Sequence, residues 1–502
     1  MSATTDFDDE TSPAAPGGPA PAPDPRRWLA LAVLLLAQLM VILDATIVNI
    51  AMPSAQIALH ISTADRQWIL TAYTLAFGGL LLLGGRIADY AGRKRVFLIG
   101  LIGFAGASAL GGAAQNADML FTARALQGAF GALLAPAALS LITVTFTEVK
   151  ERARAFGLVG AISGVGAAIG LVMGGLLTQY ADWRWCLFVN IIIAAVAFLM
   201  AVPIIKESKA EGDTKYDVPG TVMATGGLAS LVYAFSNAAN YSWTSTSTLV
   251  FLAVAAVLLA GFVVFEARTQ NPLLPLRIVL DRNRGGSYLT SVVFGAGMMG
   301  MFMFMTYYFQ QSRGYTPLKT GISYLPFSGA LIITAITASG LLPKFGPRAI
   351  MTFGGLVSTG GMFWLTQLKL DSSYAGMIMP AIVLEAIGMA SVFVPLSNTA
   401  LNGVNNHDAG VASAMVNTTQ QVGGSLGVAL LNTFFTTASA TYIAAHGAAK
   451  AALGYLHGYN VAFTVSAFLL AVATVFIFTL IRKDRAADNV TGTETPQLVH
   501  VG

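Results

Sequence analysis

Apolar runs of about 20 residues recur along the whole chain and are separated by short polar segments. At a rise of about 1.5 Å per residue, a helix of this length crosses the hydrocarbon core of a bilayer. The runs are too long for barrel strands, so the pattern predicts an all-α integral membrane protein. We expect fourteen spans, at residues 28–51, 67–85, 96–114, 118–145, 154–178, 185–205, 218–237, 246–266, 286–310, 318–342, 349–367, 375–401, 411–437 and 459–481.

The spans divide into two sets of six around a central pair. Residues 26–206 form the first half and residues 286–484 the second, and each half has a short basic loop with glycine after its second span, at residues 84–94 and 342–348. Two six-helix halves are the architecture of many secondary transporters. Residues 207–285 are then a central two-helix insert with cytoplasmic loops. The tails, 1–25 and 485–502, lack apolar periodicity and are expected to be disordered.

Lys and Arg residues indicate how the chain is oriented. Most of the 28 basic residues lie in the tails and in the loops on the same side as the tails. Cytoplasmic loops carry an excess of Lys and Arg. We therefore predict a multi-pass protein of the plasma membrane with both termini cytoplasmic.

Composition excludes several classes of function. Only 10% of residues are charged, against about 25% in a soluble domain. The net charge of +4 is distributed over the loops and does not indicate a nucleic-acid partner. Cys186 is the only cysteine, which excludes an internal disulfide and a cysteine zinc cluster. With no nucleophile–base pair and no nucleotide-binding motif, we expect neither an enzyme nor a bound metal or cofactor.

Two opposite charges lie within the predicted spans of the first half. An Asp at the centre of a membrane helix costs roughly 3 kcal/mol, so such a residue usually has a function. Asp44 and Arg124 both lie about 10 Å below the same membrane face by the helical rise. We expect them to share a site in which Arg124 keeps Asp44 acidic and relays its protonation. The alternatives are a purely structural ion pair, or an interfacial Asp44 on a helix that ends early, near Val48. We expect Pro53 to end this helix instead.

The second half has candidates for a substrate cavity. Glu385 lies about 15 Å deep in its span, and it could recognise cations, carry a second proton or remain a neutral carboxyl. Residues 298–310 are rich in Met and aromatic side chains, which adapt to flat apolar ligands. Most of them are expected to be ordinary packing residues. Tyr307 and Gln310 are our candidates for the cavity.

Two further motifs indicate moving parts. The loop after the second span contains Asp89, Gly92, Arg93 and Lys94, in which Asp89 and Arg93 are four residues apart and close enough to pair on a helix. The alternative is a basic loop that only sets topology. In the fifth span, small residues recur every four positions, which lets helices approach closely. These residues are Gly160, Gly164, Gly170, Gly174 and Gly175.

Five stretches of the chain resemble the major facilitator superfamily, and within it the fourteen-helix drug/proton antiporter branch. They are residues 43–53, 85–94, 124–128, 170–175 with 183–190, and 410–419. The chain departs from the family where Leu171 replaces the usual Pro of the fifth helix and where Gln420 replaces a frequent Arg.

The resemblance implies a proton-coupled exporter of amphipathic, often cationic, drugs or antibiotics. It would work by alternating access as a monomer in the lipid bilayer, with the proton gradient in place of a cofactor. The resemblance also places Asp89 at the start of the helix near Gly410, where it would close a cytoplasmic gate. Two alternatives are a transporter of the same fold with lipid or metabolite cargo, and a receptor or scaffold that does not transport.

Overall fold

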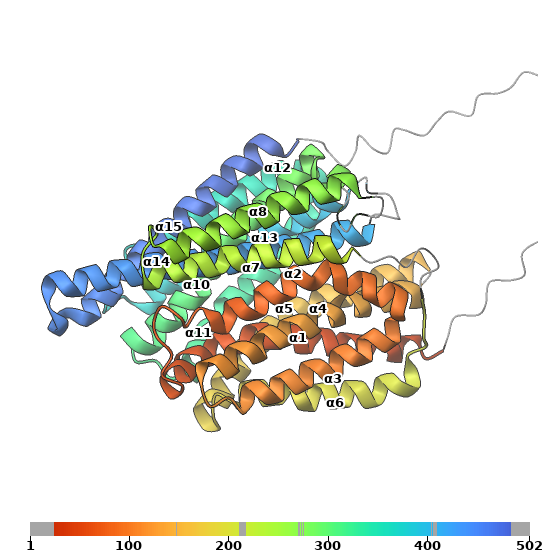
Figure 1. Ribbon diagram of the computed structural model, residues 1–502, viewed down its shortest axis with the longest axis horizontal. Helices are drawn as coiled ribbons and strands as arrows, with labels where there is room; N and C mark the ends of the chain where they lie inside the picture. Colours follow the sequence, from red (N-terminus) through yellow and green to blue (C-terminus); the bar gives the residue numbers. More distant parts are fainter. Residues whose placement is uncertain are drawn as a thin grey trace, which may run out of the picture.

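A computed structural model describes residues 25–146, 148–209, 217–269, 272, 274, 276–402, 404 and 409–482. All regular elements in these ranges are helices, most of them long and roughly aligned (Figure 1). Twelve are long and apolar enough to cross a membrane, and α5 adds a shorter apolar stretch at Val165–Tyr180. The longer helices are α1 (Arg27–Ala58), α2 (Trp68–Ala91), α3 (Arg93–Gly112), α4 (Ala117–Thr145), α5 (Val149–Tyr180), α6 (Trp185–Ile204), α7 (Val218–Asn240), α8 (Thr246–Arg268), α10 (Arg282–Tyr307), α12 (Leu325–Leu365), α13 (Met379–Leu401), α14 (Ala409–His446) and α15 (Ala451–Leu480).

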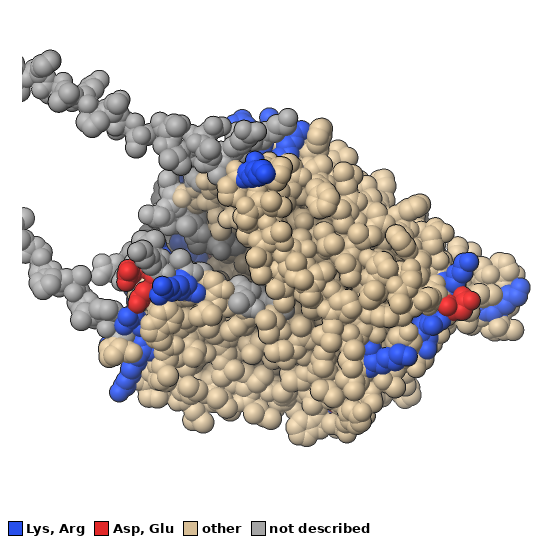
Figure 2. Space-filling view, turned by 180° about the vertical axis from the view of Figure 1, so that it is seen from behind, with Lys and Arg blue, Asp and Glu red and all other residues tan. Residues whose placement is uncertain are grey.

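Short helical segments complete the fold. They are α9 (Leu276–Val279), the π-helices η1 (Tyr308–Ser312) and η2 (Tyr374–Ile378), α11 (Pro317–Ser323) and the 3₁₀ helix η3 (Ala448–Lys450). The surface agrees with a membrane protein, because charged side chains gather at the two ends of the molecule and leave a broad uncharged belt between them (Figure 2). A helix whose outward side chains are apolar is stable only where its surroundings are apolar too.

Three predicted boundaries are wrong. Pro53 does not end the first helix, because α1 continues to Ala58. A proline removes a single backbone donor, and neighbouring helices can compensate for that loss in a membrane protein. The expected loop at 438–458 is largely helical, since α14 extends to His446 and α15 begins at Ala451. This segment is rich in Ala, the strongest helix former.

The predicted span 318–342 begins in α11, and the rest of it lies with most of the predicted span 349–367 in one helix, α12, which contains a break. Gly346 has φ 76° and ψ 163°, which is not helical. This left-handed region is costly for residues with a Cβ, and glycine adopts it readily. Pro343 and Pro347 flank the break. The 41 residues of α12 would extend about 60 Å if straight, twice the thickness of a bilayer core.

The helices pack as two groups joined along one side. In the first group α4 packs on α2 and α3, and α1 packs on α5 and α6; in the second, α12 packs on α13, and α10 and α15 pack on α14. The central helix α7 contacts both α2 and α14, and it carries α8 on its outer side. Thr225 of α7 donates to the carbonyl of Gly79, and Thr433 of α14 donates to that of Phe235. The insert therefore packs over the junction between the groups.

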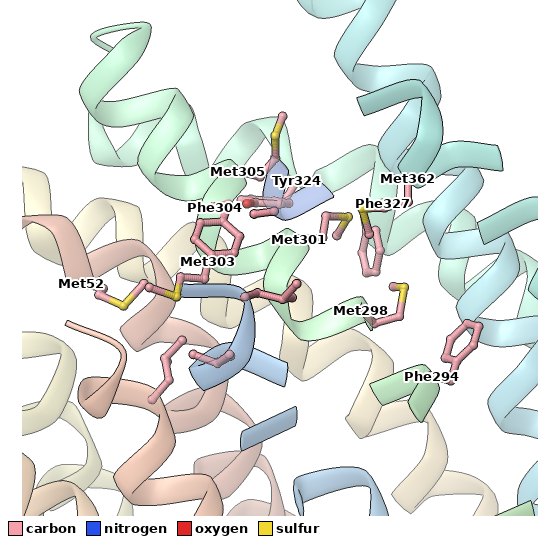
Figure 3. Packing of buried hydrophobic residues seen from close by; sticks show 14 of the residues in the cluster. Met52, Phe294, Met298, Met301, Met303, Phe304, Met305, Tyr324, Phe327 and Met362 are labelled. Atoms are coloured by element: carbon pink, nitrogen blue, oxygen red, sulfur yellow. The ribbon is translucent and has the colours of Figure 1, made fainter. Parts of the chain in front are cut away.

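The groups share one apolar core at the end that holds the loop between α1 and α2, here called the α1–α2 end. Residues from Ile47 to Ile61 belong to the same buried cluster as the Met and aromatic residues of α10. Figure 3 shows Met52 of α1 in this cluster with Met303 and Phe304 of α10. The opposite end, which holds the turn between α2 and α3, is the α2–α3 end. Its surface is hollowed in Figure 2. This arrangement closes the α1–α2 end.

Candidate functional site

Asp44 of α1 is fully buried and accepts three hydrogen bonds from two other helices. Arg124 Nη1 of α4 donates to its Oδ2 at 2.7 Å, and Gln127 Nε2 donates to its Oδ1 at 2.9 Å. Asn190 Nδ2 of α6 donates to Oδ1 at 2.8 Å. Arg124 and Gln127 lie three residues apart, so both project from the same face of α4. The expected contact between Asp44 and Arg124 is therefore present, and their role in proton coupling stays a prediction.

Further hydrogen bonds and a contact with an aromatic ring fix the position of the Arg124 side chain. Its Nε donates to the carbonyl of Ile69 at 3.0 Å, and its Nη1 also donates to Gln127 Oε1 at 2.8 Å. The guanidinium carbon lies 4.5 Å from the ring centre of Tyr73, within cation–π distance. Ser108 of α3 accepts from Gln127 Nε2 at 2.7 Å. Five helices thus converge on one ion pair.

The packing of the five helices depends on the charges of this buried pair. Desolvating two charges costs several kcal/mol, which is offset only where hydrogen bonds satisfy the remaining polar atoms. Protonation of Asp44 would leave Arg124 as an unpaired buried cation. The helices that contribute to the site would then favour a different arrangement.

Glu385 lies at the interface between α13 and α12. It is fully buried, and neither carboxylate oxygen has a hydrogen-bond partner among the described residues. An ideal Cβ at Gly361 of α12 would lie 3.1 Å from its Oε1. Glu385 therefore packs against a neighbouring helix of its own half. Burying a carboxyl group without such a partner is costly.

Tyr307 and Gln310 lie close to contacts between the two groups of helices. Tyr307 is buried beneath the guanidinium of Arg66, which lies 3.9 Å from its ring centre. Gln310 Nε2 donates to the carbonyl of Ile50 in α1 at 2.9 Å. A cavity of about 740 Å³ lies beside α11 and is lined by other residues, including Tyr315, Lys319 and Tyr374. Tyr307 and Gln310 thus lie where the two helix groups meet, whereas Glu385 packs between α12 and α13, and the place of all three in a substrate cavity stays a prediction.

The turn between α2 and α3 contacts the end of α6 and the chain that follows it. Asp89 pairs with Arg93 at 2.8 Å, as its spacing predicts. Lys94 Nζ donates to the carbonyl of Val202 at 2.7 Å. Gly92 has φ 110°, which favours glycine, and a Cβ there would lie 2.9 Å from the Glu207 carboxylate. The expected contact of Asp89 with the start of α14 involves Gly410, whose surroundings lie outside the described residues.

Glu207 caps α3, and sequence reasoning missed it. Its carboxylate accepts from the backbone N–H groups of Lys94 at 3.0 Å and Arg95 at 3.1 Å. We predict that Glu207→Ala destabilises the turn by about 1 kcal/mol, the usual cost of losing an N-terminal cap. Glu207→Gln retains an acceptor but loses the charge that favours a helix N-terminus, so it should cost less. Limited proteolysis at this turn checks the order Ala, Gln, wild type, and equal cleavage of all three contradicts it.

A second contact at the same end joins α1 to α5. Arg27 donates to Glu151 at 2.8 Å. This hydrogen bond holds the pKa of the Glu151 carboxyl below its usual value. Because both side chains begin long helices, the pair aligns the starts of α1 and α5.

The glycines of α5 allow close packing at two places. A Cβ at Gly170 would overlap Thr46 Oγ1 of α1, and one at Gly174 would lie 2.8 Å from the carbonyl oxygen of Ile47. A Cβ at Gly175 would lie 2.6 Å from the Cα of Leu318 in α11. This last contact joins the two groups of helices. The surroundings of Gly160 and Gly164 lie outside the described residues.

Three comparisons place the chain among known proteins. The model of the Major Facilitator Superfamily matches residues 34–428. The puromycin resistance protein of Streptomyces alboniger is 46% identical over 475 residues, covering 94% of each chain. The cephamycin export protein of Amycolatopsis lactamdurans is 34% identical, covering 89% of this chain and 91% of that protein.

Solved structures resemble the fold. A bacterial homologue of the human lysosomal transporter Spinster, described as inward-facing and unoccupied, matches with a TM-score of 0.65 at 17% identity, covering 91% of this chain and 97% of that one. A peptide transporter of the POT family matches with a TM-score of 0.66 at 16% identity, covering 92% and 98%. At this identity the likeness concerns the fold alone.

Proposed function

Because this chain belongs to the Major Facilitator Superfamily and to its drug-exporter branch, we propose that it is a proton-coupled exporter of antibiotics or other amphipathic drugs. The observation that carries the proton coupling is the buried Asp44–Arg124 pair, with its 2.7 Å contact between a carboxylate and a guanidinium. Asp44 takes up a proton when the cavity between the two helix groups is open to the outside. It releases the proton when the cavity is open to the inside. The energy of the proton gradient then drives the drug outward.

The proposed cycle assigns a state to the structure. The α1–α2 end faces outside and both termini lie in the cytoplasm, as the distribution of Lys and Arg favours. We propose fourteen membrane spans, counting α5 and counting α12 as two spans divided at Gly346. The apolar core shared by both helix groups at the α1–α2 end supports an arrangement closed to the outside.

The substrate class rests on the relatives. Several relatives carry names of antibiotic resistance or export proteins, and those names state the cargo of the relatives alone. For this chain we propose a compound of the same kind, an amphipathic antibiotic. A lipid or metabolite cargo is the second candidate, which the fold also permits.

Transport measurements test this proposal. A pH gradient is imposed across the membrane of inverted vesicles that contain the protein. Uptake of puromycin, ethidium and a neutral dye is then measured with and without an uncoupler. Gradient-dependent uptake of at least one drug supports antiport. Uptake of none of them, with labelled lipid moved instead, favours the second candidate and contradicts the first.

Glu385 is proposed as a second proton carrier, because its buried carboxylate has no partner among the described residues. Glu385→Gln resembles the protonated acid in shape, so we predict normal amounts of folded protein and several-fold slower gradient-driven efflux of cationic and neutral drugs alike. A loss confined to cations would instead assign it to cation recognition. Wild-type efflux of both drugs would exclude either role.

A further inference from the structure

Arg66 is a buried cation that the functional site described above does not use. It lies in the loop between α1 and α2, and its exposed fraction is 2%. No carboxylate lies within 4.0 Å of its guanidinium in the part of the chain that the structure describes, and its Nη2 has no hydrogen-bond partner there. Burying a charge without a counter-ion costs several kcal/mol. Some other interaction must therefore hold this side chain in place.

Aromatic rings of the second helix group supply that interaction. The guanidinium carbon lies 3.9 Å from the ring centre of Tyr307 and 4.6 Å from that of Phe435. Tyr459 packs on Phe435, with ring centres 4.9 Å apart. We call Tyr307, Phe435 and Tyr459 the aromatic cage. The faces of aromatic rings attract cations by about 2 kcal/mol or more when water is excluded.

One amide positions the arginine in the cage. Arg66 Nε donates to Asn432 Oδ1 of α14 at 3.3 Å. Asn432 Nδ2 donates in turn to the carbonyls of Thr63 and Ala64, at 3.1 Å and 3.0 Å. The loop and the cage belong to different helix groups, so separation of the groups at this end removes Arg66 from the rings. The cage then faces the opening without its cation.

We propose that the aromatic cage is a binding site for organic cations, and that Arg66 is the internal cation that occupies it when the α1–α2 end is closed. This inference rests on the proposed export function, because it places the cationic group of an exported compound at the outer end of the pathway. A cage without a carboxylate accepts many organic cations, since ring faces impose little directional preference. Return of Arg66 during closure displaces the bound cation toward the outside.

The test measures equilibrium binding of radiolabelled tetraphenylphosphonium to the purified full chain in lipid nanodiscs. Arg66→Gln removes the internal competitor and one contact that closes this end, so a larger share of the molecules presents an empty cage and the apparent Kd should fall on the order of tenfold. Arg66→Lys keeps a competing cation on a long side chain and should bind nearly as the wild type does. Phe435→Leu removes one ring and should weaken binding on the order of tenfold. The Leu variant also keeps the test informative if Arg66→Gln does not fold.

Several results would overturn the proposal. One is an unchanged or weaker affinity in Arg66→Gln, and another is an unchanged affinity in Phe435→Leu. An equal change in affinity for a neutral dye would identify Arg66 as a structural latch and also overturn it. The vesicle efflux of the wild type is measured separately. If the wild type shows no efflux but the variants bind as expected, the export function is contradicted and the proposed cation site is not.

Discussion

Asp44→Asn is expected to abolish efflux driven by a pH gradient while leaving the protein in the membrane. Asn has nearly the same shape and can still accept hydrogen bonds from Gln127 and Asn190, which both contact Oδ1 at present. It carries neither a charge nor an exchangeable acidic proton, so it cannot couple substrate movement to protons. Uptake into inverted vesicles with an imposed pH gradient measures the loss.

The counter-charge decides how this result is interpreted. Removing one partner of a buried ion pair typically costs about 3 to 5 kcal/mol, because Arg124 is left buried and unpaired. Asp44→Asn combined with Arg124→Gln removes both charges and should recover stability without recovering coupling. Gradient-driven efflux in this neutral double variant would contradict the role of Asp44 and move the proton site to Glu385.

Arg124→Lys separates charge from geometry. Lysine keeps the positive charge and loses the planar fork that reaches Asp44, Gln127 and the Ile69 carbonyl together. If Arg124 only neutralises the charge of Asp44, the Arg124→Lys variant should retain proton coupling. If Arg124 orients the carboxylate, this variant should lose proton coupling, as Asp44→Asn does.

Gly170→Ala is expected to disrupt the contact between α5 and α1 and to stop transport. The added Cβ would overlap Thr46 Oγ1 and would lie 3.1 Å from Thr46 Cβ. Overpacking of this kind typically costs about 1 to 3 kcal/mol. The clash lies two residues from Asp44, so displacement of α1 also disturbs the ion pair. The yield of folded protein and the efflux rate both measure the effect.

A compensating substitution makes this prediction specific. Thr46→Ala removes the overlapping oxygen, which now donates to the carbonyl of Ile42, so Gly170→Ala with Thr46→Ala should recover most of the yield and part of the efflux. Gly157→Ala is the matched control in the same helix, because no atom lies within 4 Å of a Cβ there. A similar loss in the control, or no recovery in the double variant, would show that general helix effects are responsible.

Much of the helical architecture could be predicted because hydropathy depends only on local sequence. Membrane helices satisfy their backbone groups internally, so each apolar run forms its element independently of distant contacts. The errors lie where hydropathy does not decide the outcome. Pro53 lies inside α1, and an Ala-rich segment predicted as loop extends α14 and α15. In both places neighbouring helices and intrinsic propensity determine the boundary.

The candidate site could be predicted in part. Asp44 and Arg124 were identifiable because ionised groups are rare in apolar spans, and the helical rise places them at one depth. Gln127 lies three residues after Arg124 in the stretch 124–128 that carries part of the family resemblance, but the prediction gave it no role. Asn190 ends the stretch 183–190 that carries part of the family resemblance, but the prediction gave it no role. Ser108 and Tyr73 carry no comparable signal, because single polar or aromatic residues are common in membrane helices.

By itself, the sequence determined the apolar spans, their division into two halves around an insert, and which ionisable residues lie deep within those spans. Only the tertiary structure decided the partners of those charges. Arg66 belongs to a loop in the sequence, yet the fold buries it between Tyr307 and Phe435 of the other helix group. Glu207 follows α6 but caps α3. The reason is physical: hydropathy and helical rise act along one chain segment, whereas hydrogen bonds, ring contacts and Cβ overlaps depend on which surfaces the packed helices bring together.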